Sequence, residues 1–145
     1  DDSKLSSNNY IKLGNNQSLG YAIYRIGRRD TIIDESFYIP KKAYIKVNLN
    51  NYIPQKEGDR FEVQTLFPCG PKVGHNTFLN SEYATGFSGY DNFKAINLNN
   101  KFNVLVAESE KNIVRVINVK NGIATNVDYE INVPPNNTIE LTYNY

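Results

Sequence analysis

The sequence predicts an all-β fold: a single-domain antiparallel β-sandwich of roughly nine strands, Ig-like or jelly-roll-like. Apolar and polar residues alternate with a period of two along most of the chain, as strands with one buried face require. Turn residues recur at short intervals, and no stretch carries the i, i+3, i+4 apolar stripe of an amphipathic helix. A barrel is the second choice, because the same pattern fits it.

Four segments alternate most regularly, and we expect each to be a strand with one buried face. They are residues 43–49, 60–67, 127–133 and 138–145. The apolar set in each segment is expected to point inward. The inward residues are then Ala43, Ile45, Val47 and Leu49; Phe61, Val63, Thr65 and Phe67; Val127, Tyr129, Ile131 and Val133; and Ile139, Leu141, Tyr143 and Tyr145.

Three further segments are apolar on both faces: residues 21–26, 102–107 and 112–119. Such segments are typical of central strands that are covered from both sides, or from one side and by a neighbouring loop. Asn121-Gly122 follows the last of them and predicts a tight hairpin, because both residues tolerate a positive φ. Residues 54–59 and 134–137 contain proline and polar residues and are expected to be connecting loops.

Length and composition are those of one domain with an apolar core. The chain has 145 residues, of which 40% are hydrophobic. We expect a flexible segment or linker over residues 1–8 and a single domain over 9–145. The formal net charge is +1 and the apolar runs are short, so neither a nucleic-acid partner nor a transmembrane helix is expected.

Cys69 and His75 are the only cysteine and the only histidine, and they lie six residues apart. A catalytic dyad requires the histidine to hold the cysteine as a thiolate, and nothing in this spacing forces such contact. A structural zinc site needs four Cys or His ligands, and no EF-hand-like acidic run occurs. We therefore expect no catalytic constellation, no metal and no cofactor.

Residues 68–95 break the strand pattern and are expected to form a long loop, with room for a short strand around 76–80. Aromatic residues alternate there with glycine, serine, asparagine and aspartate, which is typical of binding loops. In a second interpretation, the aromatic rings turn inward and anchor the loop to the sandwich. The candidate ligand-binding residues are Tyr83, Phe87, Tyr90, Asp91, Asn92 and His75.

These observations favour a non-enzymatic recognition or adhesion module that binds a glycan or a protein through residues 68–95. Such a module would belong to a secreted, periplasmic, cell-surface or virion protein. The alternative is a structural subunit of a surface appendage, secretion apparatus or capsid that associates through edge strands. Residues 139–145 motivate it, because a strand that alternates so regularly can pair with a neighbouring molecule.

Overall fold

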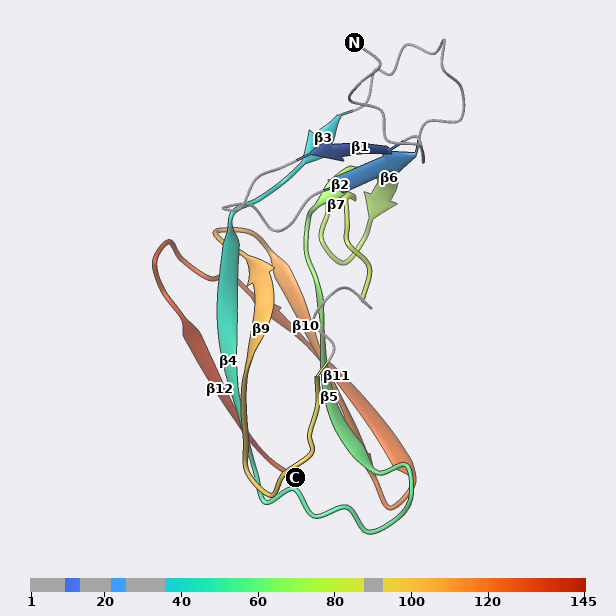
Figure 1. Cartoon of the computed structure of the whole chain (residues 1–145), viewed down its shortest axis with the longest axis vertical. Helices are drawn as coiled ribbons and strands as arrows, with labels where there is room; N and C mark the ends of the chain where they lie inside the picture. The colour runs from blue at the N-terminus through green and yellow to red at the C-terminus, as the bar shows by residue number, and fades with distance from the viewer. Residues whose placement is uncertain (1–9, 14–21, 26–35, 88–92) are drawn as a thin grey trace.

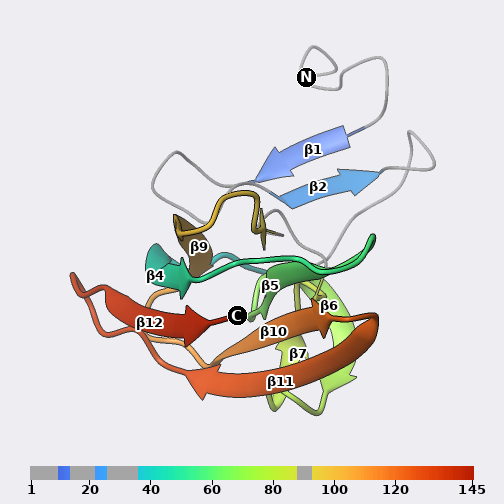
Figure 2. The same cartoon turned by 90° about the horizontal axis from the view of Figure 1, so that it is seen from below.

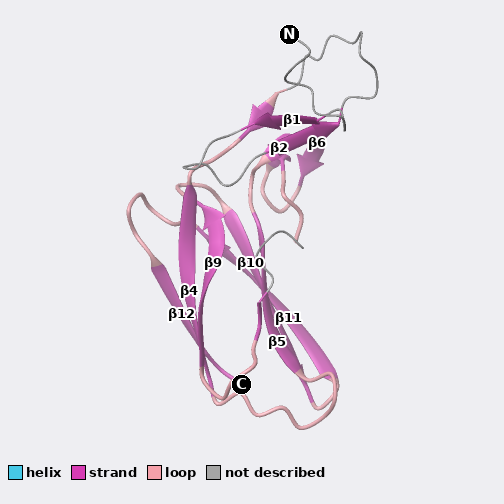
Figure 3. Ribbon diagram, in the orientation of Figure 1, coloured by secondary structure: helices cyan, strands magenta, loops and turns pink. Residues whose placement is uncertain are grey.

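The computed structural model describes residues 10–13, 22–25, 36–87 and 93–145, in which all regular structure is β-strand (Figures 1 and 3). These residues contain no helix, and hence none that could span a membrane; their sheets do not close into a barrel. The strands are β1 (Tyr10–Leu13), β2 (Ala22–Arg25), β3 (Phe37–Tyr38), β4 (Lys42–Asn50), β5 (Arg60–Leu66), β6 (Gly70–Asn76), β7 (Ser81–Tyr83), β8 (Phe93–Lys94), β9 (Asn100–Ala107), β10 (Asn112–Lys120), β11 (Ile123–Ile131) and β12 (Ile139–Asn144). The all-β prediction is confirmed.

Two sheets enclose the main core (Figure 2). One has the order β11-β10-β5-β8 and the other the order β12-β4-β9. All their pairings are antiparallel except β12 with β4, which is parallel and departs from the predicted antiparallel arrangement. The reason is that residues 132–138 carry the chain from one sheet to the other, so that β12 enters alongside β4. The shared core contains Ala43, Ile45, Val47, Leu49, Phe61, Val63, Ala95, Val104, Val106, Val114, Val116 and Val133.

Two of the four alternating segments bury the predicted face completely. The inward residues of 43–49 and of 60–67 are all buried. In β5 the outer face is covered as well, since Glu62 is 6% and Leu66 only 1% exposed. The inward residues of 138–145 are half-buried and pack against the core, while their polar neighbours are exposed.

The prediction for residues 127–133 is wrong in part. Val127 and Tyr129 lie opposite the core residues Val116 and Val114, so they are on the inner face of the sheet as expected. However, they are 48% and 39% exposed, because β11 is the edge strand of its sheet. Val133, beyond the end of β11, is fully buried.

Of the predicted central strands, one is confirmed and one is wrong. β10 lies between β11 and β5, as predicted for 112–119. β9 pairs with β4 alone among the described strands, so the prediction of a central strand at 102–107 is wrong. Its apolar character has another cause: β9 also meets the opposite sheet, where the Thr65 hydroxyl donates a hydrogen bond to the Leu105 carbonyl over 3.1 Å. In the segment 21–26, residues 22–25 form β2, which pairs with β1, while 21 and 26 lie outside the described residues.

Among the described residues, four asparagines in turns or loops have a positive φ. The predicted hairpin at Asn121-Gly122 is confirmed, with φ values of 56° and 80°. Asn51, Asn80 and Asn136 have φ values of 58°, 51° and 59°. Asparagine tolerates this left-handed region better than most residues.

Residues 68–95 contain more regular structure than predicted. β6 and β7 form an antiparallel hairpin, and residues 77–80, where the sequence leaves room for a short strand, form its turn. β3 pairs with the start of β6, and this three-stranded sheet lies at one end of the two main sheets (Figure 1). These short strands account for much of the difference between the roughly nine expected strands and the twelve described. The predicted flexible segment 1–8 lies outside the described residues.

Asn112 holds the junction between the two sheets. Its carboxamide is fully buried and accepts a hydrogen bond from the Ala107 N–H over 2.8 Å. The same group donates to the carbonyl oxygens of Ala107, Glu110 and Ile131 over 2.9, 2.9 and 3.2 Å. One side chain therefore joins the end of β9, the following turn and the end of β11.

We predict that Asn112→Ala lowers the free energy of unfolding by at least about 2 kcal/mol, because buried backbone groups of Ala107 lose their partner. Asn112→Asp should be at least as harmful, since a carboxylate cannot donate to the three carbonyls. Urea denaturation followed by circular dichroism measures both. The control is the exposed Asn132→Ala, which should change stability by less than about 0.5 kcal/mol. Equal stabilities of the Asn112 and Asn132 variants would contradict this role.

Candidate binding surface on the β6–β7 hairpin

The structure places three of the six predicted binding residues on or next to the β6–β7 hairpin. His75 lies on β6, Tyr83 on β7, and Phe87 follows β7. Tyr90, Asp91 and Asn92 lie outside the described residues. The three placed residues differ in exposure, and this decides what each can do.

Tyr83 is half-buried and packs against a second tyrosine. Its ring centroid lies 5.6 Å from that of Tyr38 on β3, with an interplanar angle of 36°. The Tyr38 hydroxyl donates to the Glu110 carboxylate, and burial together with this bond raises the pKa of Tyr38 to about 12. Tyr83 therefore attaches the hairpin to the turn that precedes β10, which is a positioning role.

Phe87 anchors the chain on the outer face of the four-stranded sheet. It packs against a cluster formed by Leu66, Leu79 and Ile113. The guanidinium carbon of Arg115 lies 3.7 Å from the centre of the Phe87 ring, a cation–π geometry. This contact agrees with the second sequence-based interpretation, in which the aromatic rings fix the segment.

Arg115 is itself held in place by an acidic partner. Its Nε and Nη2 atoms donate to the two carboxylate oxygens of Asp128 over 2.7 and 2.8 Å. This bidentate pair raises the pKa of Arg115 and lowers that of Asp128. The guanidinium is therefore fixed over the Phe87 ring by a partner on the neighbouring strand β11.

The hairpin also carries exposed side chains that are free to meet a partner. Val73 on β6 is 61% exposed and Phe78 in the turn is 47% exposed; His75 is exposed between them in sequence. We call these three residues the hairpin surface. One edge of it borders Phe87, whose ring meets that of Phe78 at 86° with centroids 5.5 Å apart.

The turn that carries Phe78 is fixed by its own residues. The Asn76 side chain accepts a hydrogen bond from the Leu79 N–H over 3.1 Å. Leu79 is only 4% exposed and anchors the turn in the apolar cluster below it. Asn76 and Leu79 thus hold the turn in place, and this turn exposes Phe78 to solvent. Phe78 and Val73 were not among the predicted binding residues, because sequence alone did not separate the exposed rings from the anchoring ones.

Cys69 and His75 do not form a pair in the described contacts. Cys69 is half-buried beside Phe67, Leu105 and Ala107, and burial raises the pKa of its thiol. A raised thiol pKa is the opposite of what an activated nucleophile needs. His75 lies near Glu82 instead: Lys72, 2.7 Å away, and to a lesser extent His75 lower the pKa of that carboxylate.

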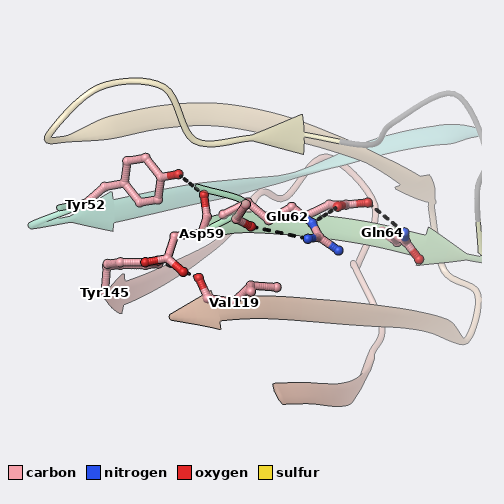
Figure 4. A network of polar contacts seen from close by, with 8 residues as sticks. Tyr52, Asp59, Glu62, Gln64, Val119 and Tyr145 are labelled. Atoms are coloured by element: carbon pink, nitrogen blue, oxygen red, sulfur yellow. Dashed lines mark hydrogen bonds and ion pairs between the residues drawn. The ribbon is translucent and has the colours of Figure 1, made fainter. Parts of the chain in front are cut away.

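A second polar cluster lies at the other end of the sheets, around Asp59 (Figure 4). Asp59 is 8% exposed, and its carboxylate accepts backbone hydrogen bonds from its own loop and from the β10–β11 turn. Burial alone would raise the pKa of Asp59, but four backbone N–H donors outweigh it. They lower the pKa to about 2 and come from Gln55, Gly122, Lys56 and Asn121.

Two tyrosines and a second acidic residue complete this cluster. The hydroxyls of Tyr52 and Tyr145 donate to the carbonyls of Asp59 and Val119, and their rings meet edge to face at 4.7 Å. Glu62 accepts from Gln64 over 2.8 Å and pairs with Arg60 over 3.3 Å (Figure 4). Because these polar groups bond to one another and to the backbone, the cluster has a structural role. No group of three or more His, Cys, Asp or Glu residues positioned to hold a metal was found among the described residues.

Comparisons of the chain with protein-family models, with curated proteins and with solved structures gave no match.

We predict that Phe87→Ala lowers the free energy of unfolding by about 2 kcal/mol, since a half-buried ring and its cation–π contact are lost. Phe78→Ala should cost less than about 1 kcal/mol, because that side chain is already 47% exposed. Thermal and urea denaturation measure the difference. If the order were reversed, Phe78 would be the anchor and Phe87 the exposed ring.

We predict that Asp59 makes stability depend on pH in the acid range. Its folded-state pKa of about 2 lies below its ordinary value of 3.8, so its contribution is present above pH 3.8 and lost as the pH falls through 2. The difference in Tm between wild type and Asp59→Asn should therefore be several degrees at neutral pH and shrink toward pH 2. Glu57→Gln, in the same loop and exposed, is the control and should differ little from wild type. A difference that stays constant with pH would contradict the role of the ionised carboxylate.

Proposed function

We propose that this chain is a non-enzymatic recognition module of a secreted, periplasmic, cell-surface or virion protein, and that it binds a glycan or a protein through the hairpin surface. The observation that carries the proposal is the exposure of Phe78 on a turn fixed by Asn76 and Leu79. A ring held in one place loses little conformational freedom when a partner covers it, which favours binding.

The surroundings of Phe78 support the same role. Thr77 and Asn80 flank Phe78-Leu79 in the turn and are exposed, so hydroxyl and amide groups accompany the ring. Sugars are bound by such combinations, through stacking on the ring and hydrogen bonds to the polar groups. Val73 and His75 extend the surface for a protein partner. The half-buried Tyr83 and Phe87 act by holding this surface in place.

The β-sandwich architecture is part of the proposal. Two sheets that share one core support it, and their four and three strands equal the count in constant-type immunoglobulin sandwiches. This count favours the Ig-like over the jelly-roll-like alternative, which has eight strands. In such sandwiches, the loops and hairpins at the ends of the sheets are the usual recognition surfaces.

A second candidate function is that of a structural subunit of an appendage, secretion apparatus or capsid. The edge strands β11 and β12 favour it, since in the described residues each pairs with a single strand. Edge strands present backbone donors and acceptors that another chain can use.

The recognition role is tested with a glycan array and with a pull-down from lysate of cells or hosts that carry the partner. For any ligand found, Phe78→Ser should raise the Kd at least about tenfold, as expected for an aromatic contact at the centre of an interface. The matched control is Ile96→Ser, because Ile96 is 82% exposed and lies away from the hairpin in sequence. Blank results in both assays, or equal Kd values for the two variants, would contradict binding through the hairpin surface.

A further inference from the structure

The two main sheets contact each other along both sides. Along one side, the Thr65 hydroxyl of β5 donates a hydrogen bond to the Leu105 carbonyl of β9. Along the other side, the edge strands β11 and β12 meet through Tyr129 and Tyr143, whose ring centroids are 6.3 Å apart. In Figure 1, β12 is the outermost strand on its side.

β12 directs half of its backbone groups away from its sheet. The Tyr145 N–H donates to the Asn50 carbonyl at the end of β4 over 3.1 Å. Because successive residues of a strand point their N–H and C=O groups to opposite sides, residues 139, 141 and 143 also face β4. The backbone groups of Glu140, Thr142 and Asn144 then face the free edge.

β12 carries little of the usual protection of an edge strand. Edge strands are commonly guarded by lysine, proline, a bulge or an inward charge. β12 has an unbroken register with β4, and its sequence contains neither lysine nor proline. Its one charged residue, Glu140, already interacts with Asn48 and with Lys46 at 3.3 Å.

β11, the other edge on this side, is guarded by charge. Asp128 and Glu130 lie two residues apart on its outer face, where their partners are Arg115 and Lys111. In an antiparallel pair of two β11 strands centred on Tyr129, each Asp128 would face a Glu130. Like charges directly opposite each other destabilise a strand pair. β12 has a single acidic residue, so an antiparallel β12 pair centred on Thr142 contains no such like-charge contact.

We propose that β12 pairs antiparallel with β12 of a second copy of this chain, joining two three-stranded sheets into one of six strands. This inference deepens the second candidate function by naming the edge and the partner, and it does not depend on the recognition role. A two-fold axis at Thr142 pairs all residues from 139 to 145. Thr142 then faces its own copy, and Glu140 faces Asn144 of the second copy.

The inner face of the joined sheet also fits this register. The same axis places Leu141 opposite Tyr143 and Ile139 opposite Tyr145 of the second copy. These side chains are half-buried in one chain, so the partner covers apolar surface that solvent otherwise reaches. Aromatic–aliphatic pairs across strands are favourable, and a two-fold interface of this kind closes on itself.

Sedimentation velocity over a dilution series tests the proposal on the whole chain. Wild type should form a dimer that dissociates on dilution, with a Kd in the micromolar range expected for a small interface. Thr142→Pro removes an N–H that faces the free edge and should raise this Kd at least about tenfold. Thr142→Lys places two like charges at the axis and should do the same. Asn126→Lys on the exposed part of β11 is the matched control and should dimerise like wild type.

Circular dichroism and Tm show whether each variant is folded. A folded Thr142→Pro or Thr142→Lys monomer, beside a dimeric Asn126→Lys, is the expected result. A wild-type monomer at every concentration would overturn the proposal, and so would an undiminished dimer in both Thr142 variants. Loss of the dimer in Asn126→Lys would overturn it too, because the interface would then lie on β11. None of these outcomes changes the result expected for Phe78 in the binding assays, so the two proposals fail separately.

Discussion

The arrangement of the two sheets depends on how the chain passes from one to the other, and Asn112 fixes that passage. Residues 107–112 leave β9 in one sheet and enter β10 in the next, and the buried Asn112 carboxamide satisfies backbone groups of Ala107 before the turn and of Glu110 within it. Two backbone bonds reinforce the same place: the Glu108 N–H donates to the Lys41 carbonyl and the Ser109 N–H to that of Val133. A buried polar group that satisfies several partners specifies one geometry, since any shift leaves some of them unpaired.

Beyond this junction, the two sheets are joined by different contacts along their two sides. β9 lies against β5, where a side-chain hydrogen bond joins the sheets, whereas β11 and β12 meet through tyrosine rings. β11 is exposed along almost its whole length, and the inner face of β12 is half-buried. The short sheet of β3, β6 and β7 is attached at the junction end through Tyr38, Glu110 and Phe87. Tyr38 and Phe87 thus attach the short sheet to the main sheets, whereas the ring of Phe78 on the same hairpin stays exposed.

The alternation of apolar and polar residues predicted the features that are determined within a single strand or turn. The buried faces of 43–49 and 60–67 followed from it, as did the hairpin at Asn121-Gly122. The exposure of Val127 did not follow from the alternation, because this exposure depends on how far the opposite sheet extends. The division of the aromatic residues at 78–87 into anchors and exposed rings depends on contacts with β5 and β10, which are distant in sequence. The sequence places Asp59 in a connecting loop but does not show that its carboxylate is buried, where it accepts the N–H groups of Gln55 and Lys56.

The asparagines in the turns affect how this sequence can change over time. At four places the backbone adopts a handedness that most side chains resist, and asparagine accepts it while keeping a polar surface. Glycine fits this conformation without a steric cost, and aspartate and, as at Ser109, serine also adopt it, so neutral drift at these sites is restricted to a few residue types. β-branched residues do not fit this backbone conformation. At these four positions the asparagine therefore meets a steric requirement of the backbone.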